Sequence, residues 1–304
     1  MPYFHRFVEA FPTVYDLAKA SQDQVLRLWQ GLGYYSRARN LHACAQEIVE
    51  QHGGQFPSSY RELLKLKGVG TYTAAAVASF AFNETVPVVD GNVYRVLSRV
   101  FGIKDDVGST SGQKQFRKQA ELLVPKGKAN VYNQAIMEFG ALQCTPHNPA
   151  CLLCPLNGMC YAYQHGQQQK LPVKAKKTKV RSRFLHYLVI RSQDRLWMKQ
   201  RGNKGIWAGL YDFYTIETPQ ASTLDELDDS LLRWLLQQEE ITVETSPLYQ
   251  HTLSHQRLHV LFHTVMLNRN VSVRENCLRP YSVQEVEALP KPILVDNFLQ
   301  KEIF

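Results

Sequence analysis

The stretch Leu64-Lys-Leu-Lys-Gly-Val-Gly-Thr-Tyr-Thr-Ala-Ala75 lies between two segments of helical pattern. Before it, Ser59 and Glu62 stand at the spacing of a capping box, which predicts the start of a short helix that ends near Leu66. After the glycines, residues 71–82 return to helix-forming sequence. The sequence therefore predicts helix, hairpin and helix at this point of the chain.

The hairpin of Gly68, Val69 and Gly70 has two possible uses. Glycine permits backbone conformations that are closed to other residues, so the hairpin and the next helix can direct several N–H groups at one phosphate. The same pattern is equally expected where a helix simply ends in a tight turn. These residues alone leave both interpretations open.

Apolar periodicity distinguishes the two halves of the chain. In the first half, apolar residues recur at helical spacing in two runs that we expect to face a core. These residues are Phe4, Phe7, Val8 and Phe11, and then Val93, Val96, Leu97 and Val100. In the second half, residues 184–190, 196–199 and 258–266 indicate strands, and residues 224–238 and 283–304 indicate helices. The second half is therefore predicted to be α+β.

A basic segment separates these halves. Residues 164–183 lack apolar periodicity, and Pro172 interrupts any helix there. The basic residues of this segment are Lys170, Lys174, Lys176, Lys177, Lys179, Arg181 and Arg183. We expect a helical domain over residues 1–163, a basic linker over 164–183 and an α+β domain over 184–304. The linker is either a solvated tether or a strap along a phosphate backbone.

Composition and charge limit the class of protein. The chain has 304 residues, of which 44% are apolar and 20% charged, as in a soluble globular protein with two cores. Its formal charge of +8 favours a polyanionic partner, although a basic surface without a ligand is an equal alternative. We expect a monomer that does not associate with membranes and is located in the cytoplasm, near the nucleoid.

Four of the six cysteines stand at C-x6-C-x2-C-x5-C. They are Cys144, Cys151, Cys154 and Cys160. Four thiolates at this spacing are typical of a metal site, either an iron–sulfur cluster or structural zinc. Zinc sites usually contain two short C-x2–4-C pairs, and the presence of one pair favours the cluster. Disulfides are disfavoured because the printed sequence shows no signal peptide.

Asp90 opens the helical run of residues 93–100. Taken alone, its most common role would be to cap the helix by accepting hydrogen bonds from amides of the first turn. A carboxylate kept ionised by helix amides can also stabilise a developing cation or attack it. Both roles are compatible with the sequence.

Several motifs in a fixed order resemble the helix–hairpin–helix DNA glycosylases with an iron–sulfur cluster. They are residues 64–75, the run Val89-Asp-Gly-Asn-Val93 and the four cysteines. Within that superfamily, Trp29-Gln-Gly-Leu-Gly-Tyr-Tyr-Ser-Arg-Ala-Arg-Asn40 is similar to the adenine DNA glycosylases, which remove adenine mispaired with 8-oxoguanine or guanine. Residues 205–213 and 251–255 are similar to that family's Nudix-like C-terminal recognition domain.

The resemblance implies roles in the first domain. Asp90 matches the aspartate that stabilises the oxocarbenium ion, and Asn92 and Tyr72 match its supporting polar groups. Related lyases carry lysine at the position of Tyr72, and an amine is needed to form a Schiff base, so a monofunctional glycosylase is implied. Tyr34 matches the aromatic wedge beside the damaged guanine. The four cysteines would hold a [4Fe–4S] cluster.

In the second domain, Ser254 and His255 match the residues that sense 8-oxoguanine. Leu253 replaces an aromatic residue of the family pattern, which removes a stacking contact and keeps the hydrogen-bonding groups. The Nudix hydrolase signature is missing, and the acidic residues of the region lack its arrangement. These residues are Asp225, Glu226, Asp228 and Asp229. A domain that reads the lesion is therefore implied.

The largest departure from the family concerns its general acid. That glutamate lies upstream of the segment matching residues 1–7 and is missing from the printed sequence. A misassigned start, an internal start and a truncation are the alternatives. We expect a monofunctional adenine glycosylase that acts on double-stranded DNA with adenine opposite 8-oxoguanine or guanine. A catalytically silent, lesion-binding fragment or pseudoenzyme is the alternative, and an endonuclease III-like pyrimidine glycosylase is a third, which Tyr72 and the second domain oppose.

Overall fold

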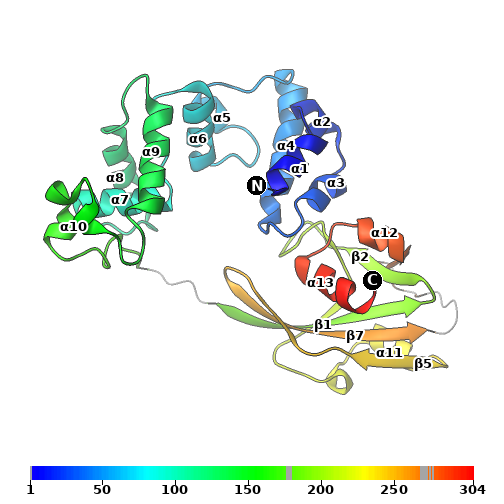
Figure 1. Ribbon diagram of the computed structural model, residues 1–304. Coiled ribbons are helices and arrows are strands. Elements are labelled where there is room, and N and C mark those ends of the chain that lie inside the picture. Colours follow the sequence, from blue (N-terminus) through cyan, green and yellow to red (C-terminus); the bar gives the residue numbers. More distant parts are fainter. Residues whose placement is uncertain (1, 176–179, 268–272, 274, 276) are drawn as a thin grey trace. The chain divides into compact units, whose positions relative to one another are not determined.

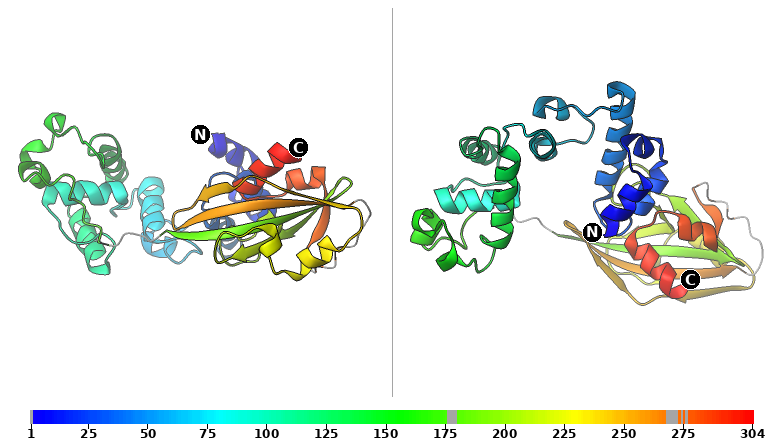
Figure 2. Two further views of the ribbon diagram at one scale, coloured as in Figure 1. Left: turned by 90° about the horizontal axis from the view of Figure 1, so that it is seen from below. Right: turned by 45° about the horizontal axis from the view of Figure 1, so that its top comes forward.

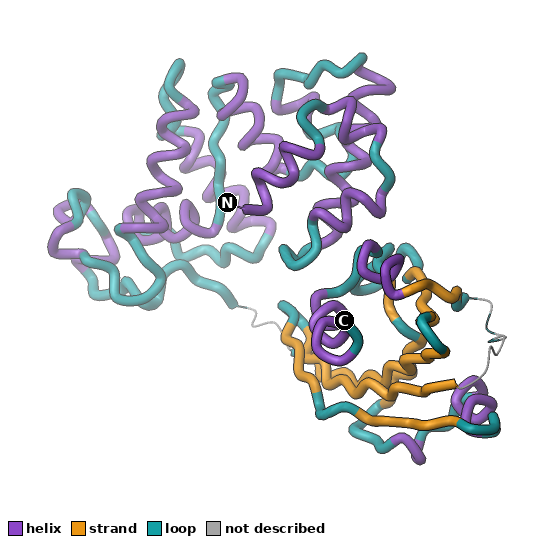
Figure 3. Tube along the Cα trace, turned by 45° about the vertical axis from the view of Figure 1, so that its right-hand side comes forward, coloured by secondary structure: helices purple, strands orange, loops and turns teal. Residues whose placement is uncertain are grey.

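The computed structural model describes residues 2–175, 180–267, 273, 275 and 277–304. The chain forms two compact units, and their helices and strands are coloured in Figure 3. Residues 46–177 form the first, which we call the helical unit, and residues 1–45 with 178–304 form the second, the sheet unit. Lys176, Lys177 and Lys179 of the predicted linker lie outside the described residues. No helix in the described part of the chain is both long and apolar enough to cross a membrane.

The helical unit contains the predicted helix, hairpin and helix. Its elements are the end of α4 (Tyr35–His52), α5 (Tyr60–Leu63), α6 (Thr71–Phe82), α7 (Gly91–Phe101), α8 (Thr110–Glu121), α9 (Ala129–Leu142), η1 (Cys151–Leu153), η2 (Asn157–Met159) and α10 (Tyr161–Gln164). The apolar face predicted on α7 is buried, with Val93 and Leu97 each 1% exposed. Phe116 of α8 belongs to the same core, and its ring packs edge-on against Tyr94 with 5.0 Å between the ring centres.

The hairpin between α5 and α6 follows from local chemistry. The Ser59 hydroxyl accepts a hydrogen bond from the Glu62 amide at 3.3 Å and caps α5, which ends at Leu63, slightly earlier than predicted. Gly68 has a φ of 74°, in the left-handed region that favours glycine. Gly70 is the N-cap of α6 and provides no side-chain cap, so the first amides of this helix have no side-chain partner at the cap position.

The sheet unit is built on a mixed sheet with the central order β3-β2-β1-β7-β5 (Figure 1). The strands are β1 (Arg181–Ser192), β2 (Arg195–Gln200), β3 (Tyr211–Asp212), β4 (Tyr214–Thr218), β5 (Ile241–Thr245), β6 (Tyr249–Thr252), β7 (Gln256–Leu267) and β8 (Arg279–Ser282). The two long strands, β1 and β7, are parallel neighbours, in register from Arg181 opposite Gln256 to Arg191 opposite Met266. The three strands predicted from the sequence lie within β1, β2 and β7.

Helices cover both faces of this sheet. The helix α13 (Ile293–Glu302) lies on one face and α11 (Ser230–Leu236) on the other, as the left view of Figure 2 shows in red and yellow. On the α13 face, the ring of Phe298 stacks on Phe262 at 4.0 Å. The predicted helix over residues 283–304 is two helices, α12 (Val283–Ala288) and α13, because Pro290 and Pro292 separate them.

The prediction for residues 224–238 is only partly correct. They form the short turn η3 (Leu224–Glu226) and then α11, which begins after Asp229. The break arises because the Asp229 carboxylate accepts hydrogen bonds from the amides of Leu231 and Leu232 and so caps a new helix.

The first 45 residues pack with the sheet. The helices α1 (Pro2–Ala10), α2 (Val14–Lys19), α3 (Gln22–Leu28) and the start of α4 precede the helical unit in the chain. Leu26 and Ala38, both 0% exposed, share one apolar core with Leu210 and Phe298 of the sheet unit. The domain boundaries predicted from the sequence, at residues 163 and 183, remain a prediction.

The core face predicted on α1 is wrong for half of its residues. Phe7 and Phe11 pack against the sheet-unit core, and Phe7 contacts the Trp29 ring at 5.7 Å. Phe4 is 63% exposed and Val8 is 44% exposed. Within the described residues, α1 therefore has a packing partner on one side of its apolar stripe only.

Candidate functional site

Asp90 is the N-cap of α7, as predicted, and both of its carboxylate oxygens are occupied. Oδ1 accepts a hydrogen bond from the Val93 amide at 2.8 Å, and Oδ2 accepts one from the Asn92 side-chain amide at 3.0 Å. These two donors fix the carboxylate at the N-terminal, positive end of the α7 dipole. Such a group can stabilise a positive charge or act as a nucleophile.

A chain of hydrogen bonds continues from Asn92 to the cysteine loop. The side-chain oxygen Oδ1 of Asn92 accepts a hydrogen bond from Arg95 Nη2 at 2.8 Å, and Arg95 Nε donates to the backbone carbonyl of Cys144 at 2.7 Å. Gly140 permits the close approach of α9, because a Cβ atom there would lie 2.7 Å from the Asn92 Cβ. Asp90 and Cys144 are thus connected through two side chains.

Tyr72 lies in the first turn of α6 and is 45% exposed. Partial burial, and then the negative charge of Asp90, raise the pKa of its phenol, so the group stays protonated at neutral pH. Tyr72 lines a cavity of about 210 Å³ next to Val89 and Tyr94.

One wall of this cavity was not predicted from the sequence. Four polar residues of α8 line it: Thr110, Gln113, Lys114 and Arg117. Their spacing of i, i+3, i+4 and i+7 places them on one helix face, and this polar periodicity was the available signal. Arg117 is already engaged, because it donates to the Tyr60 hydroxyl at 2.7 Å and pairs with Glu121 at 3.0 Å.

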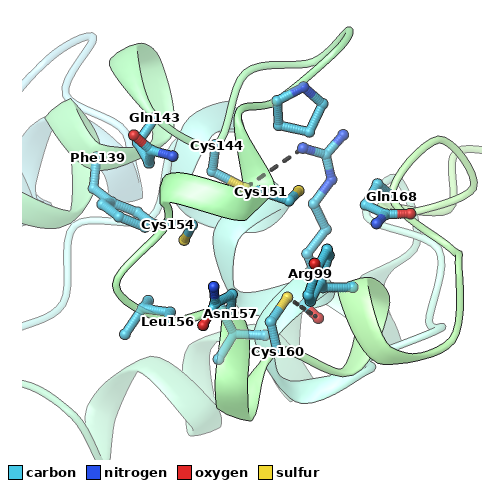
Figure 4. A pocket seen from close by; sticks show the side chains of 13 residues that line it. Arg99, Phe139, Gln143, Cys144, Cys151, Cys154, Leu156, Asn157, Cys160 and Gln168 are labelled. Carbon is cyan, nitrogen blue, oxygen red and sulfur yellow. Dashed lines mark hydrogen bonds between the residues drawn. The ribbon is translucent and has the colours of Figure 1, made fainter.

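The four predicted cysteines line a single cavity in the helical unit (Figure 4). Arg99 Nη1 donates to the Cys144 sulfur at 3.4 Å, and the Cys160 thiol donates to the Arg99 carbonyl at 3.4 Å. Burial, and then the neighbouring cysteine thiolates, raise the pKa of the Cys151 thiol. Deprotonated on binding a metal, four such side chains around one space form a soft donor set.

The number and kind of these side chains fit a four-iron cluster. Such a cluster takes four cysteine thiolates as ligands, and four cysteines line this cavity. Within the described ranges, no three cysteine, histidine or carboxylate side chains gather closely enough to hold one metal ion.

Two buried arginines support the same interpretation. Arg95 is 9% exposed and Arg99 is 2% exposed, and their guanidinium groups donate to backbone carbonyls. Among the residues that the structure describes, neither forms an ion pair with a carboxylate. Buried positive charge without a counter-ion is unfavourable, and an anionic thiolate-ligated cluster would supply the opposite charge.

A second group of predicted residues meets within the sheet unit. The Tyr34 hydroxyl lies 3.0 Å from the Ser254 hydroxyl, so either can donate to the other. Tyr34 is 65% exposed, has a φ of 49°, and its ring lies 4.9 Å from the guanidinium carbon of Arg37. The Tyr34 side chain therefore lies at the surface of the sheet unit. Ser254 and His255 form the tip of the β6–β7 hairpin, and Leu253 packs against the core of the unit.

The segment that resembles the family's recognition domain is anchored to the first helices. Arg39 of α4 donates to the Ala208 carbonyl at 2.7 Å. Gly209 has a φ of 80°, and a Cβ atom there would lie 3.0 Å from the Gln22 side-chain nitrogen.

Two of the acidic residues named from the sequence bind side chains of their own domain. Asp229 accepts a hydrogen bond from the Tyr214 hydroxyl at 3.0 Å, and Asp228 forms an ion pair with Arg233 at 3.1 Å.

Comparisons with known proteins define the class. Residues 1–126 match the HhH-GPD superfamily of base excision DNA repair proteins, and residues 186–301 match the NUDIX domain. This combination is a helix–hairpin–helix glycosylase followed by a Nudix-like domain.

Individual relatives narrow the class further. The adenine DNA glycosylase of Buchnera aphidicola subsp. Schizaphis graminum is 33% identical over 86% of this chain and 74% of its own. That of Buchnera aphidicola subsp. Baizongia pistaciae is 30% identical over 99% of this chain and 84% of its own. The human adenine DNA glycosylase is 45% identical over 56% of this chain and 31% of its own. The chain belongs to the adenine DNA glycosylase family, whose members are base-excision repair enzymes that hydrolyse N-glycosyl bonds.

Among solved structures, a thermostable thymine-DNA glycosylase is 30% identical over 54% of this chain and 76% of that chain, with a TM-score of 0.49.

Proposed function

We propose that this chain removes adenine that is mispaired with 8-oxoguanine or guanine in double-stranded DNA. The observation that carries the proposal is the fixed carboxylate of Asp90, which accepts hydrogen bonds from Val93 and Asn92 at 2.8 and 3.0 Å. As the bond between the sugar C1′ and the base nitrogen breaks, the electron pair leaves with adenine and the sugar becomes cationic. Asp90 stabilises this cation, directly or as a transient covalent partner, until water adds at C1′.

Tyr72 limits the reaction to base removal. A lyase needs an amine that attacks C1′ to form a Schiff base, and the phenol of Tyr72 cannot form one. With its raised pKa, Tyr72 supports the site as a neutral hydrogen-bonding group. The chain therefore acts as a monofunctional glycosylase.

Contacts with the DNA involve three groups of residues. The backbone amides of Gly68, Val69 and Gly70 bind phosphate without regard to sequence. Tyr34 enters the duplex beside the damaged guanine. Ser254 and His255 bond the altered edge of 8-oxoguanine, since a hydroxyl and an imidazole can each donate and accept. One monomer, with a helical domain over residues 1–163 and a recognition domain over 184–304, carries all three.

Cys144, Cys151, Cys154 and Cys160 would hold a [4Fe–4S] cluster, which would supply negative charge next to Arg95 and Arg99. The carbonyl of Cys144 fixes Arg95, which in turn fixes Asn92 against Asp90.

Single-turnover release of adenine from a labelled duplex tests the proposal. Asp90→Asn should abolish release while leaving duplex binding intact, because the amide keeps the shape of the side chain and loses its charge. Release by Asp90→Asn at the wild-type rate would overturn the proposed role of Asp90.

A further inference from the structure

The tip of the β6–β7 hairpin is held by its flanking residues. The Leu253 amide donates to the Gln256 carbonyl at 2.7 Å, which closes a two-residue loop of Ser254 and His255. The Arg181 amide donates to the His255 carbonyl at 3.0 Å. Because Ser254 and His255 are exposed, the direction of their side chains depends on how the residues beside them are fixed. We call residues 253–256 the reading turn.

Arg183 reaches this turn from the neighbouring strand β1. Its Nη1 donates to the side-chain oxygen of Gln256 at 2.9 Å. Its Nε and Nη2 donate to the two carboxylate oxygens of Glu217 on β4, at 2.7 and 2.6 Å. The side chain of Arg183 is 18% exposed, so three strands are joined by one partly buried guanidinium group.

The planar guanidinium group is suited to this arrangement. Its donors diverge in a fixed fork, so the bidentate contact with Glu217 determines where the remaining nitrogen points. The hydrogen bond to Glu217 raises the pKa of Arg183, and the hydrogen bond from Arg183 lowers the pKa of Glu217, so both groups stay charged. Arg183 was predicted as one of several linker cations. Its pairing with Glu217 neutralises it, which removes the reason to expect a phosphate contact.

We infer that Arg183, oriented by Glu217, is a positioning residue that holds the reading turn through Gln256 and thereby sets the preference for 8-oxoguanine over guanine. This role rests on the proposed function of Ser254 and His255. In the described part of the chain, the hydrogen bonds of the Arg183 side chain go to Glu217 and Gln256, so it acts on Ser254 and His255 through the geometry of the turn.

Competition binding to matched duplexes, with adenine opposite 8-oxoguanine or opposite guanine, tests the inference on the full chain. Arg183→Gln and Gln256→Ala should each reduce the preference for 8-oxoguanine about three- to tenfold, the typical net effect of losing one hydrogen bond. The double variant should lose no more than Arg183→Gln alone, since both changes remove the same contact. A full additive loss would overturn the link through Gln256.

Arg181→Gln is the matched control. It removes the same charge two residues away on the same strand, from a side chain that is 77% exposed and 4.0 Å from the same Glu217. Its backbone amide, which holds His255, is unaffected. Arg181→Gln should weaken binding to all duplexes slightly and leave the preference unchanged. An equal loss of preference in Arg181→Gln and Arg183→Gln would show a charge effect and overturn the positioning role.

Two further variants separate the possible failures. Arg183→Lys keeps the charge, but an ammonium group cannot bond both Glu217 oxygens and Gln256 in one plane. We expect this variant to melt at the same temperature as the wild type and still to lose part of the preference for 8-oxoguanine. If it melts like the wild type and retains the full preference, the positioning role is overturned. If Ser254→Ala with His255→Ala reduces the preference and the Arg183 variants do not, the inference alone fails. If the Ser254 and His255 changes have no effect, the proposed reading function fails as well.

Discussion

The hydroxyl oxygens of Tyr34 and Ser254 lie 3.0 Å apart, although 220 residues separate them in the sequence. Both residues belong to the sheet unit, because the first helices share an apolar core with the sheet. The residue proposed to enter the duplex and a residue proposed to read the lesion are therefore joined within one compact unit. A substitution at either residue should therefore alter how the side chain of the other is held.

Removing only the Tyr34 hydroxyl should affect lesion preference more than affinity. Tyr34→Phe keeps the ring and loses the bond to Ser254, which contributes about 1 kcal/mol, so the preference for 8-oxoguanine should fall about fivefold. Tyr34→Ala should weaken binding to both mispairs, because the ring is lost. Competition binding measures both values. If Tyr34→Phe reduced binding to both mispairs equally, the coupling to Ser254 would be refuted.

The metal content of protein purified without oxygen should distinguish a cluster from zinc. We expect about four iron and four sulfide per chain. Cys151→Ser should lower the melting temperature of the helical unit, and elemental analysis with a sulfide assay provides the measurement. Cys44→Ser is the control, since Cys44 lies outside the four-cysteine cavity. Stoichiometric zinc in the wild-type protein would contradict the cluster.

Arg95 should affect both catalysis and stability. Arg95→Gln removes the donor that links Asn92 to the Cys144 carbonyl, so adenine release should slow while duplex affinity is retained. The lost bonds of a side chain that is 9% exposed should also lower the free energy of unfolding by about 1–3 kcal/mol. Single-turnover kinetics and thermal melting measure the two effects. A slow variant that also fails to bind the duplex would point to misfolding and refute the separate catalytic effect.

Alanine at the hairpin glycines should weaken binding to every duplex alike. Gly70 is the more informative position, because its φ is −90° and no atom lies within 4 Å of an added Cβ, so the fold accepts alanine. A methyl group there would meet a bound phosphate. Gly68→Ala adds backbone strain at a φ of 74° and tests a different effect. A change in lesion preference with Gly70→Ala would argue against a phosphate contact.

The stability of the sheet unit should depend on pH through a buried histidine pair. His263 Nε2 lies 3.0 Å from His186 Nδ1, and both side chains are buried. Burial, and then His186, lower the pKa of His263 from 6.5 to about 4. Between these two pH values His263 is protonated in the unfolded chain and neutral in the folded chain. The free energy of unfolding should therefore fall as the pH falls from about 6.5 to about 4.

Denaturant unfolding between pH 4 and 8 measures this slope. His263→Gln should flatten it, and the exposed His255→Gln should leave it unchanged. A slope that persists in His263→Gln would assign the effect to another group.

Local features of this protein could be predicted from the sequence, and distant contacts could not. Residues 71–82 and the cap at Asp90 depend on neighbours in the chain, so spacing and capping chemistry were sufficient. The packing of residues 1–45 against the sheet depends on core partners more than 130 residues away, which periodicity does not encode. The predicted core face of α1 failed for the same reason, since a stripe of apolar residues does not specify what covers it.

The candidate site shows the same limit. Family resemblance assigned Asp90, Tyr72 and the cysteines, but Arg95 and Arg183 read as ordinary basic residues. Each has a partner in a distant segment of the chain: Arg95 donates to the backbone carbonyl of Cys144, and Arg183 donates to the side chain of Gln256. A sequence pattern contains no information on which partner a long cationic side chain reaches.

The shared core of the first helices and the sheet has a consequence for synthesis of the protein. A ribosome completes α1–α3 early, but Leu210, Phe262 and Phe298, which bury them, emerge only near the end of translation. The helical unit between them has local contacts and can fold while synthesis continues. The N-terminal segment must therefore wait with its apolar residues uncovered, and a truncation at the C-terminus should expose the beginning of the chain to proteases and aggregation.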